Sequence, residues 1–166
     1  MRKLEVFFDY NCPYCYKGHL SLLGFVKDKP DLEIVWHPSE ISSFKDRSGK
    51  NGTDLSLQGM FFAAENNADM WKYHSRIYEL KFDREANTHN IDAFVKELGD
   101  ILDPASLKEA LVSGKYKKRL MESNQFAFSK TGVHVVPTYR ADDGFLQDRQ
   151  EFYGLGSSDT GYGGTK

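Results

Sequence analysis

Two cysteines separated by two residues are the feature of this sequence that most directly suggests chemistry. Cys12 and Cys15 are the only cysteines in a chain of 166 residues, so a disulfide within the chain would close a very short loop. Closing so short a loop adds little to the stability of a fold, which leaves thiol reactivity or metal binding as the reason for the spacing. The pair therefore predicts thiol–disulfide exchange or part of a metal site.

The residues beside the pair predict which thiol reacts first. A predicted strand precedes Cys12 and Pro13 follows it, and proline favours the first position of a helix, so Cys12 is expected at a helix N-terminus. Backbone N–H groups there, together with the positive end of the helix, lower the pKa of a thiol. We expect Cys12 to be the nucleophile and Cys15 to resolve the mixed disulfide. Tyr14, between them, is expected to be exposed, to tune the redox couple and to contact substrate.

A zinc site is the alternative interpretation of the same spacing. His19 lies one helical turn after Cys15 and would be a third ligand. The remaining histidines show no paired spacing that would complete a tetrahedral site; they are His37, His74, His89 and His134. We interpret His19 instead as a solvated helix residue whose protonated form would favour a nearby thiolate. A zinc-stabilised binding module stays as the non-enzymatic alternative.

A strand, a helix and a second strand are the elements expected to position the cysteines. Residues 3–9 alternate between two faces, residues 13–29 carry apolar side chains at three- and four-residue intervals, and residues 32–37 alternate again before Pro38. The first strand places Leu4, Val6 and Phe8 on one face and Glu5, Phe7 and Asp9 on the other. This order predicts a parallel pair of strands joined by a right-handed crossover.

About half of the chain, beyond a polar loop at residues 44–51, shows helical periodicity. Apolar residues recur at helical spacing over residues 57–64, 70–78, 91–98 and 116–128. Asp103 and Pro104 mark the start of one more helix, with a capping residue followed by a proline at the first helical position. Four large side chains in the chain, Trp36, Phe61, Met70 and Trp71, are interpreted as core rather than as a substrate groove.

After Gly132 the sequence returns to the composition of strands. Residues 133–139 are rich in β-branched side chains and predict a strand, and residues 142–144 predict a hairpin turn into a short returning strand. Asp148 is expected to cap a brief helix that ends near Leu155. The glycine-rich residues 157–166 predict a flexible tail.

Composition and charge exclude several classes of function. The formal net charge is −2, so no strong positive field favours nucleic acid, and we expect no nucleic-acid partner. The longest apolar stretch, residues 20–26, is far shorter than the ~20 residues that cross a bilayer, so no membrane partner is expected. The first residues are charged and resemble no secretory signal, which predicts a cytoplasmic protein.

Three segments resemble the DsbA-like thioredoxin-fold proteins, and in particular their FrnE-type branch. They are residues 9–18, which hold the CPxC pattern followed by an aromatic residue and glycine, residues 36–38, and residues 132–139. The resemblance covers most of residues 3–155 and implies an α/β thioredoxin fold with a large all-helical insertion between the strand-helix-strand half and the C-terminal hairpin. Residues 1–40 and 131–156 would form the thioredoxin-like domain, and residues 41–130 the helical insertion.

The resemblance also implies a substrate-binding surface and the class of substrate. Val136 and Pro137 would be joined by a cis peptide beside the cysteines, with the Val136 backbone free to pair with an extended substrate strand. Pro13 and Tyr14 would complete this surface. The sequence by itself is equally consistent with Pro137 as a trans proline at a strand edge. The implied activity is dithiol–disulfide exchange with protein or peptide thiols or glutathione, through a redox-active disulfide and without another cofactor.

A second resemblance keeps an alternative activity open. Gln147, Asp148 and Arg149 resemble a stretch of kappa-class glutathione transferases and 2-hydroxychromene-2-carboxylate isomerases, which implies a glutathione contact at Gln147 and Asp148. A hairpin exit followed by a helix cap explains the same residues. Those relatives typically carry serine at the position of Cys12, so dithiol exchange is the favoured prediction. The Pro13–Tyr14 pair also occurs in glutaredoxins, but those are much shorter.

Overall fold

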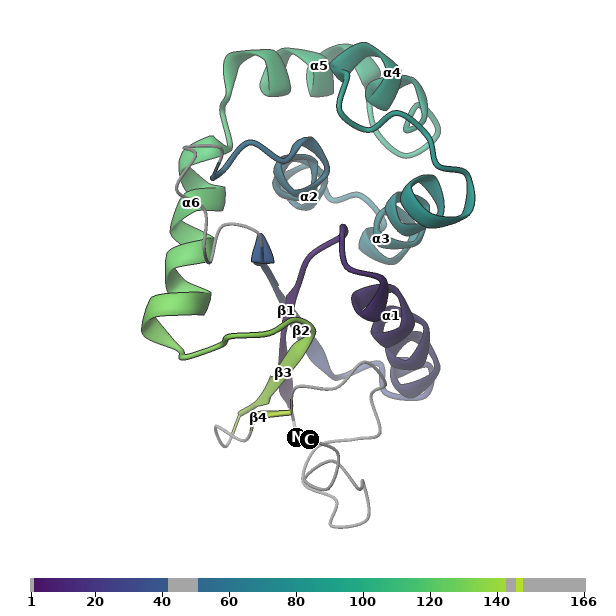
Figure 1. Ribbon diagram of the computed structural model, residues 1–166. Coiled ribbons are helices and arrows are strands. Elements are labelled where there is room, and N and C mark those ends of the chain that lie inside the picture. The colour runs from purple at the N-terminus through teal and green to yellow at the C-terminus, as the bar shows by residue number, and fades with distance from the viewer. Residues whose placement is uncertain (1, 42–50, 143–145, 148–166) are drawn as a thin grey trace.

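A four-stranded sheet forms one end of the molecule in the computed structural model, which describes residues 2–41 and 51–142 and the backbone of residues 146–147 (Figure 1). The strand order is β2-β1-β3-β4. The strands are β1 (Lys3–Phe8), β2 (Glu33–Pro38), β3 (Thr138–Ala141) and β4 (Leu146–Gln147). β1 pairs in parallel with β2 and antiparallel with β3, and α1 (Pro13–Val26) connects β1 to β2. The predicted strand, helix and parallel strand are therefore confirmed.

The described elements between β2 and β3 are all helical. They are α2 (Leu55–Glu65), α3 (Met70–Tyr78), α4 (Ile91–Lys96), α5 (Pro104–Ser113) and α6 (Lys117–Gln125). Two π-helical turns continue α3 and α6, namely η2 (Glu79–Asp83) and η3 (Phe126–Lys130). Figure 1 shows α2 to α5 gathered beyond the carboxyl end of β1, where α1 begins. The polypeptide that leaves β1 is therefore enclosed between the sheet and these helices.

The strand β1 is buried on both faces, and its side chains divide between the faces as the alternating sequence predicts. Leu4, Val6 and Phe8 belong to the main core together with Leu22 of α1. Phe7 points to the other face, where it packs with side chains of η3 and the following segment. Burying a side chain of this size contributes about 1.5–3 kcal/mol, so the alternation fixes the register of the central strand.

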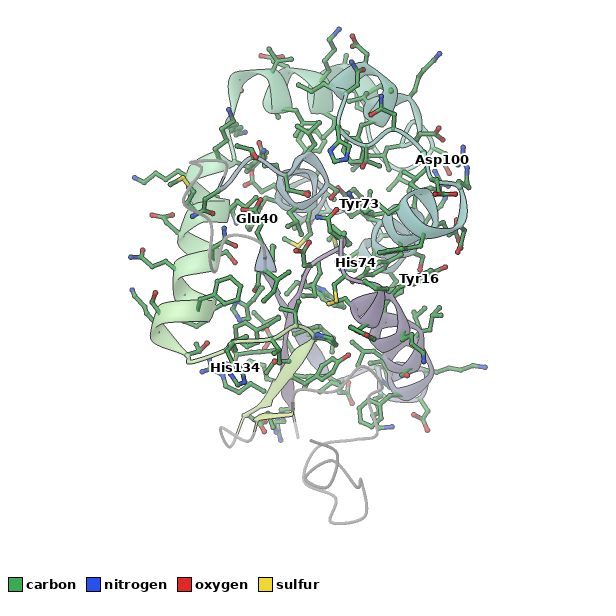
Figure 2. The ribbon with its side chains drawn as sticks, in the orientation of Figure 1. Tyr16, Glu40, Tyr73, His74, Asp100 and His134 are labelled. Carbon is green, nitrogen blue, oxygen red and sulfur yellow. The ribbon has the colours of Figure 1, made fainter. Side chains whose placement is uncertain are left out.

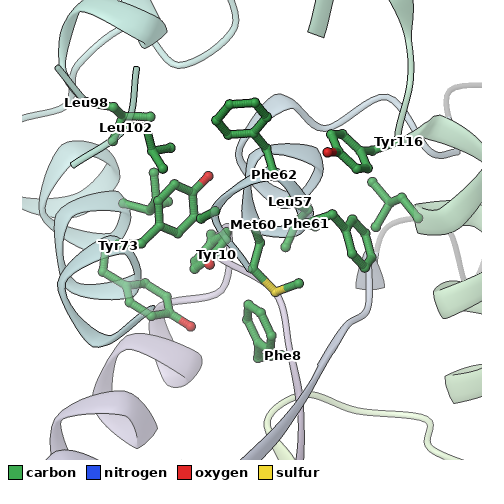
Figure 3. Close-up of a cluster of buried hydrophobic side chains, with 14 of the residues drawn as sticks. Phe8, Tyr10, Leu57, Met60, Phe61, Phe62, Tyr73, Leu98, Leu102 and Tyr116 are labelled. Atoms are coloured by element: carbon green, nitrogen blue, oxygen red, sulfur yellow. The ribbon is translucent and has the colours of Figure 1, made fainter. Parts of the chain in front are cut away.

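Helix α2 forms the centre of the helical core (Figure 3). Every residue from Ser56 to Ala63 is buried, and the close-up shows its aromatic and methionine side chains between those of neighbouring helices. Gly59 allows the approach of α3, because a Cβ at this position would lie 2.4 Å from the hydroxyl of Tyr73. Asp54 begins the helix by accepting a hydrogen bond from the Leu57 N–H at 2.8 Å.

Two predicted element boundaries were wrong. The first helix ends at Val26 rather than at residue 29. The strand predicted over residues 133–139 begins only at Thr138, because the preceding backbone turns away from the ladder. Gly132 has a φ of +78°, and the Val133 N–H donates to Ala127 instead of to a neighbouring strand. The β-branched composition of this segment therefore did not determine its conformation.

The helical predictions correspond closely to the observed helices, with two exceptions. Asp103 caps α5, and Pro104 is its first residue, as predicted. The last predicted helix divides into α6 and the π-helical turn η3, and the π-helical turn η2 was not predicted. The predictions for residues 44–50, for the Asp148 helix and for the tail lie outside the described residues. No helix in the described ranges is long and apolar enough to cross a membrane.

Candidate active site at the two cysteines

Cys12 lies where the chain passes from the sheet into α1. The Cys12 backbone is extended, with φ −104° and ψ 119°, and Pro13 follows as the first residue of the helix. The Cys12 carbonyl accepts hydrogen bonds from the N–H groups of Cys15 at 3.0 Å and Tyr16 at 3.3 Å. Both cysteines are free thiols, Cys12 half-buried and Cys15 buried. The position predicted for Cys12 from the following proline is confirmed.

The pKa of Cys12 is lowered from 9.0 to about 7, mainly because the Cys15 thiol donates a hydrogen bond to its sulfur. Burial opposes this effect, and the N–H groups of Cys15 and Tyr14 add to it. The Cys12 sulfur makes no capping hydrogen bond of regular geometry, so these amides act as weaker contacts than we predicted. The direction of the predicted shift is confirmed, but the neighbouring thiol is a larger cause than the helix N-terminus.

Cys15 has an environment that keeps its proton in place. The Cys15 side chain is 2% exposed, and burial is the main reason why its pKa is well above the usual value. The Cys15 sulfur accepts a hydrogen bond from the Asp9 N–H, with 3.5 Å between nitrogen and sulfur. At neutral pH the pair therefore combines a Cys12 with a lowered pKa and a protonated Cys15 that donates to it.

The segment before β3 supplies the other side of the site. The Cys12 sulfur lies 3.7 Å from the carbonyl oxygen of Val136, and the Val136–Pro137 peptide bond is cis. Tyr14 is 57% exposed, as expected, and Val135 is 38% exposed. The structure thus brings the segment of Val136 and Pro137 to the start of α1, which carries Pro13 and Tyr14.

The structure describes only the backbone of Gln147 among the residues that resemble glutathione transferases. Gln147 belongs to β4 and is opposite Tyr139 in the ladder. Its side chain, like the whole of Asp148, lies outside the described part of the chain. Their proposed contact with glutathione therefore stays a prediction.

Asp9 is a buried residue of the site that we did not single out from the sequence. Its carboxylate accepts hydrogen bonds from the backbone N–H of Asn11 at 3.0 Å and of Ile41 at 3.1 Å. Burial, together with the nearby charge of Asp54, raises the pKa of Asp9 to about 6. Its position directly after β1 and ahead of the cysteine pair could have indicated a site residue, but the sequence does not show that the Asp9 side chain is buried.

His19 is buried, which corrects its interpretation as a solvated residue. Only 5% of His19 is exposed, because α3 packs against this face of α1, and its Nε2 lies 2.8 Å from the hydroxyl of Ser75. Burial lowers the pKa of His19 to about 4, so the imidazole is neutral at pH 7 and does not supply the positive charge we considered. Across the described ranges, no group of three or more possible ligand residues is arranged to hold a metal ion.

A small cavity lies behind Cys15. Its volume is about 10 Å³, and its lining combines side chains of β1, α1, α3, β2 and the segment around Pro137; these include Cys15, His19, Trp36, His74, Tyr78 and Pro137. Figure 2 places His74 at this junction, below Tyr73. A larger hollow of about 510 Å³ lies beside α6, and its lining contains neither cysteine nor histidine.

Comparisons with known proteins agree with this geometry. The model of the DSBA-like thioredoxin domain matches residues 3–157. A curated relative, the uncharacterized protein YwbO of Bacillus subtilis, is 26% identical, and the alignment covers 84% of this chain and 86% of the relative.

Solved structures show the same fold. A probable DsbA oxidoreductase from Streptomyces coelicolor has a TM-score of 0.72, with 14% identity, 90% of this chain and 84% of that chain covered. A 2-hydroxychromene-2-carboxylate isomerase has a TM-score of 0.71, with 13% identity and 89% of each chain covered. The DsbA of Chlamydia trachomatis has a TM-score of 0.68, with 16% identity, 88% of this chain and 78% of that chain covered. The predicted thioredoxin fold with a helical insertion is confirmed.

Proposed function

Because this chain belongs to the DSBA-like thioredoxin domain family, we propose that it is a thiol–disulfide oxidoreductase in which Cys12 and Cys15 exchange a disulfide with protein or peptide substrates. Glutathione is the small thiol that would serve as an alternative substrate. The observation that carries the proposal is that the two thiols have pKa values shifted in opposite directions. The pKa of Cys12 is lowered to about 7, and the buried Cys15 donates the hydrogen bond responsible for most of that shift.

The first step uses the thiolate of Cys12. Because the pKa of Cys12 is lowered to about 7, a substantial fraction of the Cys12 side chains is ionised at neutral pH. The thiolate attacks one sulfur of a substrate disulfide, the bond between the Cys12 sulfur and that sulfur forms, and the other substrate sulfur leaves as a thiolate. Cys12 is half-buried rather than enclosed, so a substrate can approach its sulfur.

The second step uses Cys15. Its sulfur attacks the Cys12 sulfur, the Cys12–Cys15 disulfide forms, and the remaining substrate thiolate leaves and takes up the Cys15 proton. Two electrons pass from the pair to the substrate disulfide. The same steps in reverse oxidise two substrate thiols, so the redox environment determines the direction of exchange.

Backbone and apolar groups beside Cys12 support a peptide as substrate. Tyr14 and Val135 are large exposed side chains, and they precede Cys15 and Val136 in the two segments that meet at the Cys12 sulfur. The Val136 carbonyl lies 3.7 Å from the sulfur and is an acceptor for a substrate backbone N–H once the Cys12 proton has gone. Pro13, Tyr14, Val136 and Pro137 are the residues that we propose to contact the substrate.

A Cys15→Ser variant tests the proposal. Without a resolving thiol, a disulfide-bonded model peptide should remain attached to Cys12, and multiple turnover should fall by at least about 100-fold, since only exchange with external thiol can release the product. The trapped species is detected by its mass and by its release with a reductant. Catalysis unaffected by the substitution would contradict the proposal.

The same variant distinguishes the alternative activity. A glutathione-dependent transferase or isomerase would activate glutathione without cycling through the Cys12–Cys15 disulfide, so it would keep its activity in Cys15→Ser. Wild-type and variant protein are therefore assayed with glutathione and 2-hydroxychromene-2-carboxylate in parallel. Glutathione-dependent isomerisation in both proteins, without a trapped peptide, would favour the alternative.

A further inference from the structure

In the resolving step negative charge develops on the Cys15 sulfur, and the two cysteines alone provide no hydrogen-bond donor for it. Cys15 is buried and its pKa is well above the usual value, mainly because of burial. In the reduced protein its thiol donates to the Cys12 thiolate, but in the mixed disulfide Cys12 carries no charge and accepts weakly. Negative charge then develops on a buried sulfur, so a hydrogen-bond donor near Cys15 would accelerate the step.

The cavity behind Cys15 contains one such donor. His74 is 1% exposed and lines the cavity, as Cys15 does. Its Nδ1 lies 2.6 Å from the hydroxyl of Tyr10, which does not line the cavity, whereas its Nε2 has no hydrogen-bond partner among the described residues. A buried N–H without a partner costs about 1–3 kcal/mol, so the unpartnered nitrogen indicates a ligand.

The direction of the hydrogen bond between Tyr10 and His74 sets where the imidazole proton lies. Tyr10 is fully buried, and His74 Nδ1 is within reach of its hydroxyl. If the hydroxyl donates to Nδ1, both groups are satisfied and the imidazole proton must be on Nε2. The pKa of His74 is lowered well below 6.5, mainly by burial, so the ring stays neutral and keeps this arrangement at physiological pH.

The other titratable groups around the cavity are neutral too, or already bonded. They are His19, whose Nε2 is paired with Ser75, together with Tyr78 and Tyr139, whose pKa values burial raises. Asp9 is not part of the cavity lining, and its backbone N–H contacts the Cys15 sulfur. Tyr78 and Tyr139 keep their hydroxyl protons, and His74 Nε2 is the buried nitrogen of this lining that has no hydrogen-bond partner among the described residues.

We propose that the cavity holds one water, which accepts a hydrogen bond from His74 Nε2 and donates one to the Cys15 sulfur, and so stabilises the sulfur that resolves the mixed disulfide. A volume of about 10 Å³ is that of a site for a single water. His74 keeps its proton throughout. The Cys15 proton passes to the leaving substrate thiolate, the bond between the two cysteine sulfurs forms, and the bond from Cys12 to the substrate sulfur breaks.

This inference rests on the proposed function, and an aromatic disulfide probe separates the two. Reduced protein reacts with 5,5′-dithiobis(2-nitrobenzoate) in two phases, because Cys12 releases the first thionitrobenzoate and Cys15 releases the second. In His74→Phe we expect the second phase to slow by about tenfold at pH 7, since one hydrogen bond to the reacting sulfur is lost. The pH midpoint of that phase should rise, and the first phase should stay within about twofold.

Leu22→Val is the matched control, because it enlarges the same cavity without changing a polar group. It should leave both phases unchanged within about twofold. A second phase in His74→Phe as fast as in the wild type would overturn the role of His74. Equal slowing of both phases, or equal slowing in Leu22→Val, would overturn it too, because packing would then be the cause.

A measurement on the wild type covers the case in which His74→Phe does not fold. In protein with ¹⁵N-labelled histidine, NMR coupling patterns identify the protonated nitrogen of each ring. We expect the His74 proton on Nε2 between pH 6 and 8, and a proton on Nδ1 would overturn the inference. If wild-type protein shows no second thionitrobenzoate phase, the dithiol function itself fails. If that phase is present but independent of His74, only this inference fails.

Discussion

The backbone N–H of Asp9 donates a hydrogen bond to the sulfur of Cys15, with 3.5 Å between the two atoms. The same residue carries a buried carboxylate whose negative charge raises the pKa of Cys12 and of Cys15. Asp9 therefore supports the pair through its backbone and opposes ionisation of the pair through its side chain. This relationship links the titration of one buried carboxyl to the reactivity of both thiols.

Replacing Asp9 with asparagine should make Cys12 more acidic. Asp9→Asn removes the charge but keeps a backbone N–H for Cys15, so the pH midpoint of Cys12 alkylation should fall below the value of about 7 expected for the wild type. Iodoacetamide rates measured from pH 4 to 10 check this. Asp103→Asn, at the exposed cap of α5, is the control and should leave the midpoint in place. A midpoint that rises in Asp9→Asn would contradict the electrostatic account.

Asp9 and His19 should affect stability in opposite directions as the pH changes. The folded pKa of Asp9 is raised from 3.8 to about 6, so its contribution is present below pH 4 and is lost as the pH rises to 6. The folded pKa of His19 is lowered from 6.5 to about 4, so its contribution is present above pH 6.5 and is lost as the pH falls to 4. Each effect is on the order of 3 kcal/mol.

Single variants should separate these two opposing effects. The free energy of unfolding of His19→Gln should rise less from pH 4 to 6.5 than that of the wild type, because the His19 effect is removed while the opposing Asp9 effect and that of His74 remain. That of Asp9→Asn should rise more steeply from pH 4 to 6.5 than that of the wild type, because the opposing Asp9 effect is removed while the effects of His19 and His74, whose pKa burial also lowers, remain. Urea denaturation at several pH values checks both slopes. Identical slopes in the two variants would show that the shifted pKa values are wrong.

An ion pair far from the thiols provides a prediction about stability alone. Arg140 donates to the Glu5 carboxylate through Nε at 2.6 Å and Nη2 at 2.9 Å, and the Glu5 side chain is 11% exposed. Arg140→Met should lower the free energy of unfolding by about 3 kcal/mol, because it leaves a buried carboxylate without its main partner. Glu5→Gln with Arg140→Met should cost less than the sum of the single changes. Denaturation curves measure this, and thiol exchange by the folded variants should be unchanged.

Local signals were sufficient to predict the elements that hold the cysteines. The alternation of residues 3–9 and Pro13 at the start of a helix act over a few residues, so they predicted β1 and α1 correctly. Caps are local too, and Asp103 with Pro104 predicted the start of α5. The position of Cys12 at the start of α1 follows from these neighbours.

Long-range packing explains what the sequence did not predict. His19 was interpreted as solvated because nothing in α1 shows that α3 covers it, and its partner Ser75 lies 56 residues away. The π-helical turn η3 and the backbone after Gly132 place Val136 beside Cys12, and this overrides the strand preference of residues 133–137. The unpartnered Nε2 of His74 is visible only when α3, β1 and α1 are assembled.

The pH dependence of Cys12 alkylation tests the central claim most directly. In reduced wild-type protein the initial rate should be half-maximal near pH 7, because the pKa of Cys12 is lowered to about 7 with Cys15 as the main cause. In Cys15→Ala, which cannot donate a hydrogen bond, the midpoint should move up toward 9. A wild-type midpoint near 9, unchanged in Cys15→Ala, would show an ordinary thiol and contradict the proposed exchange mechanism.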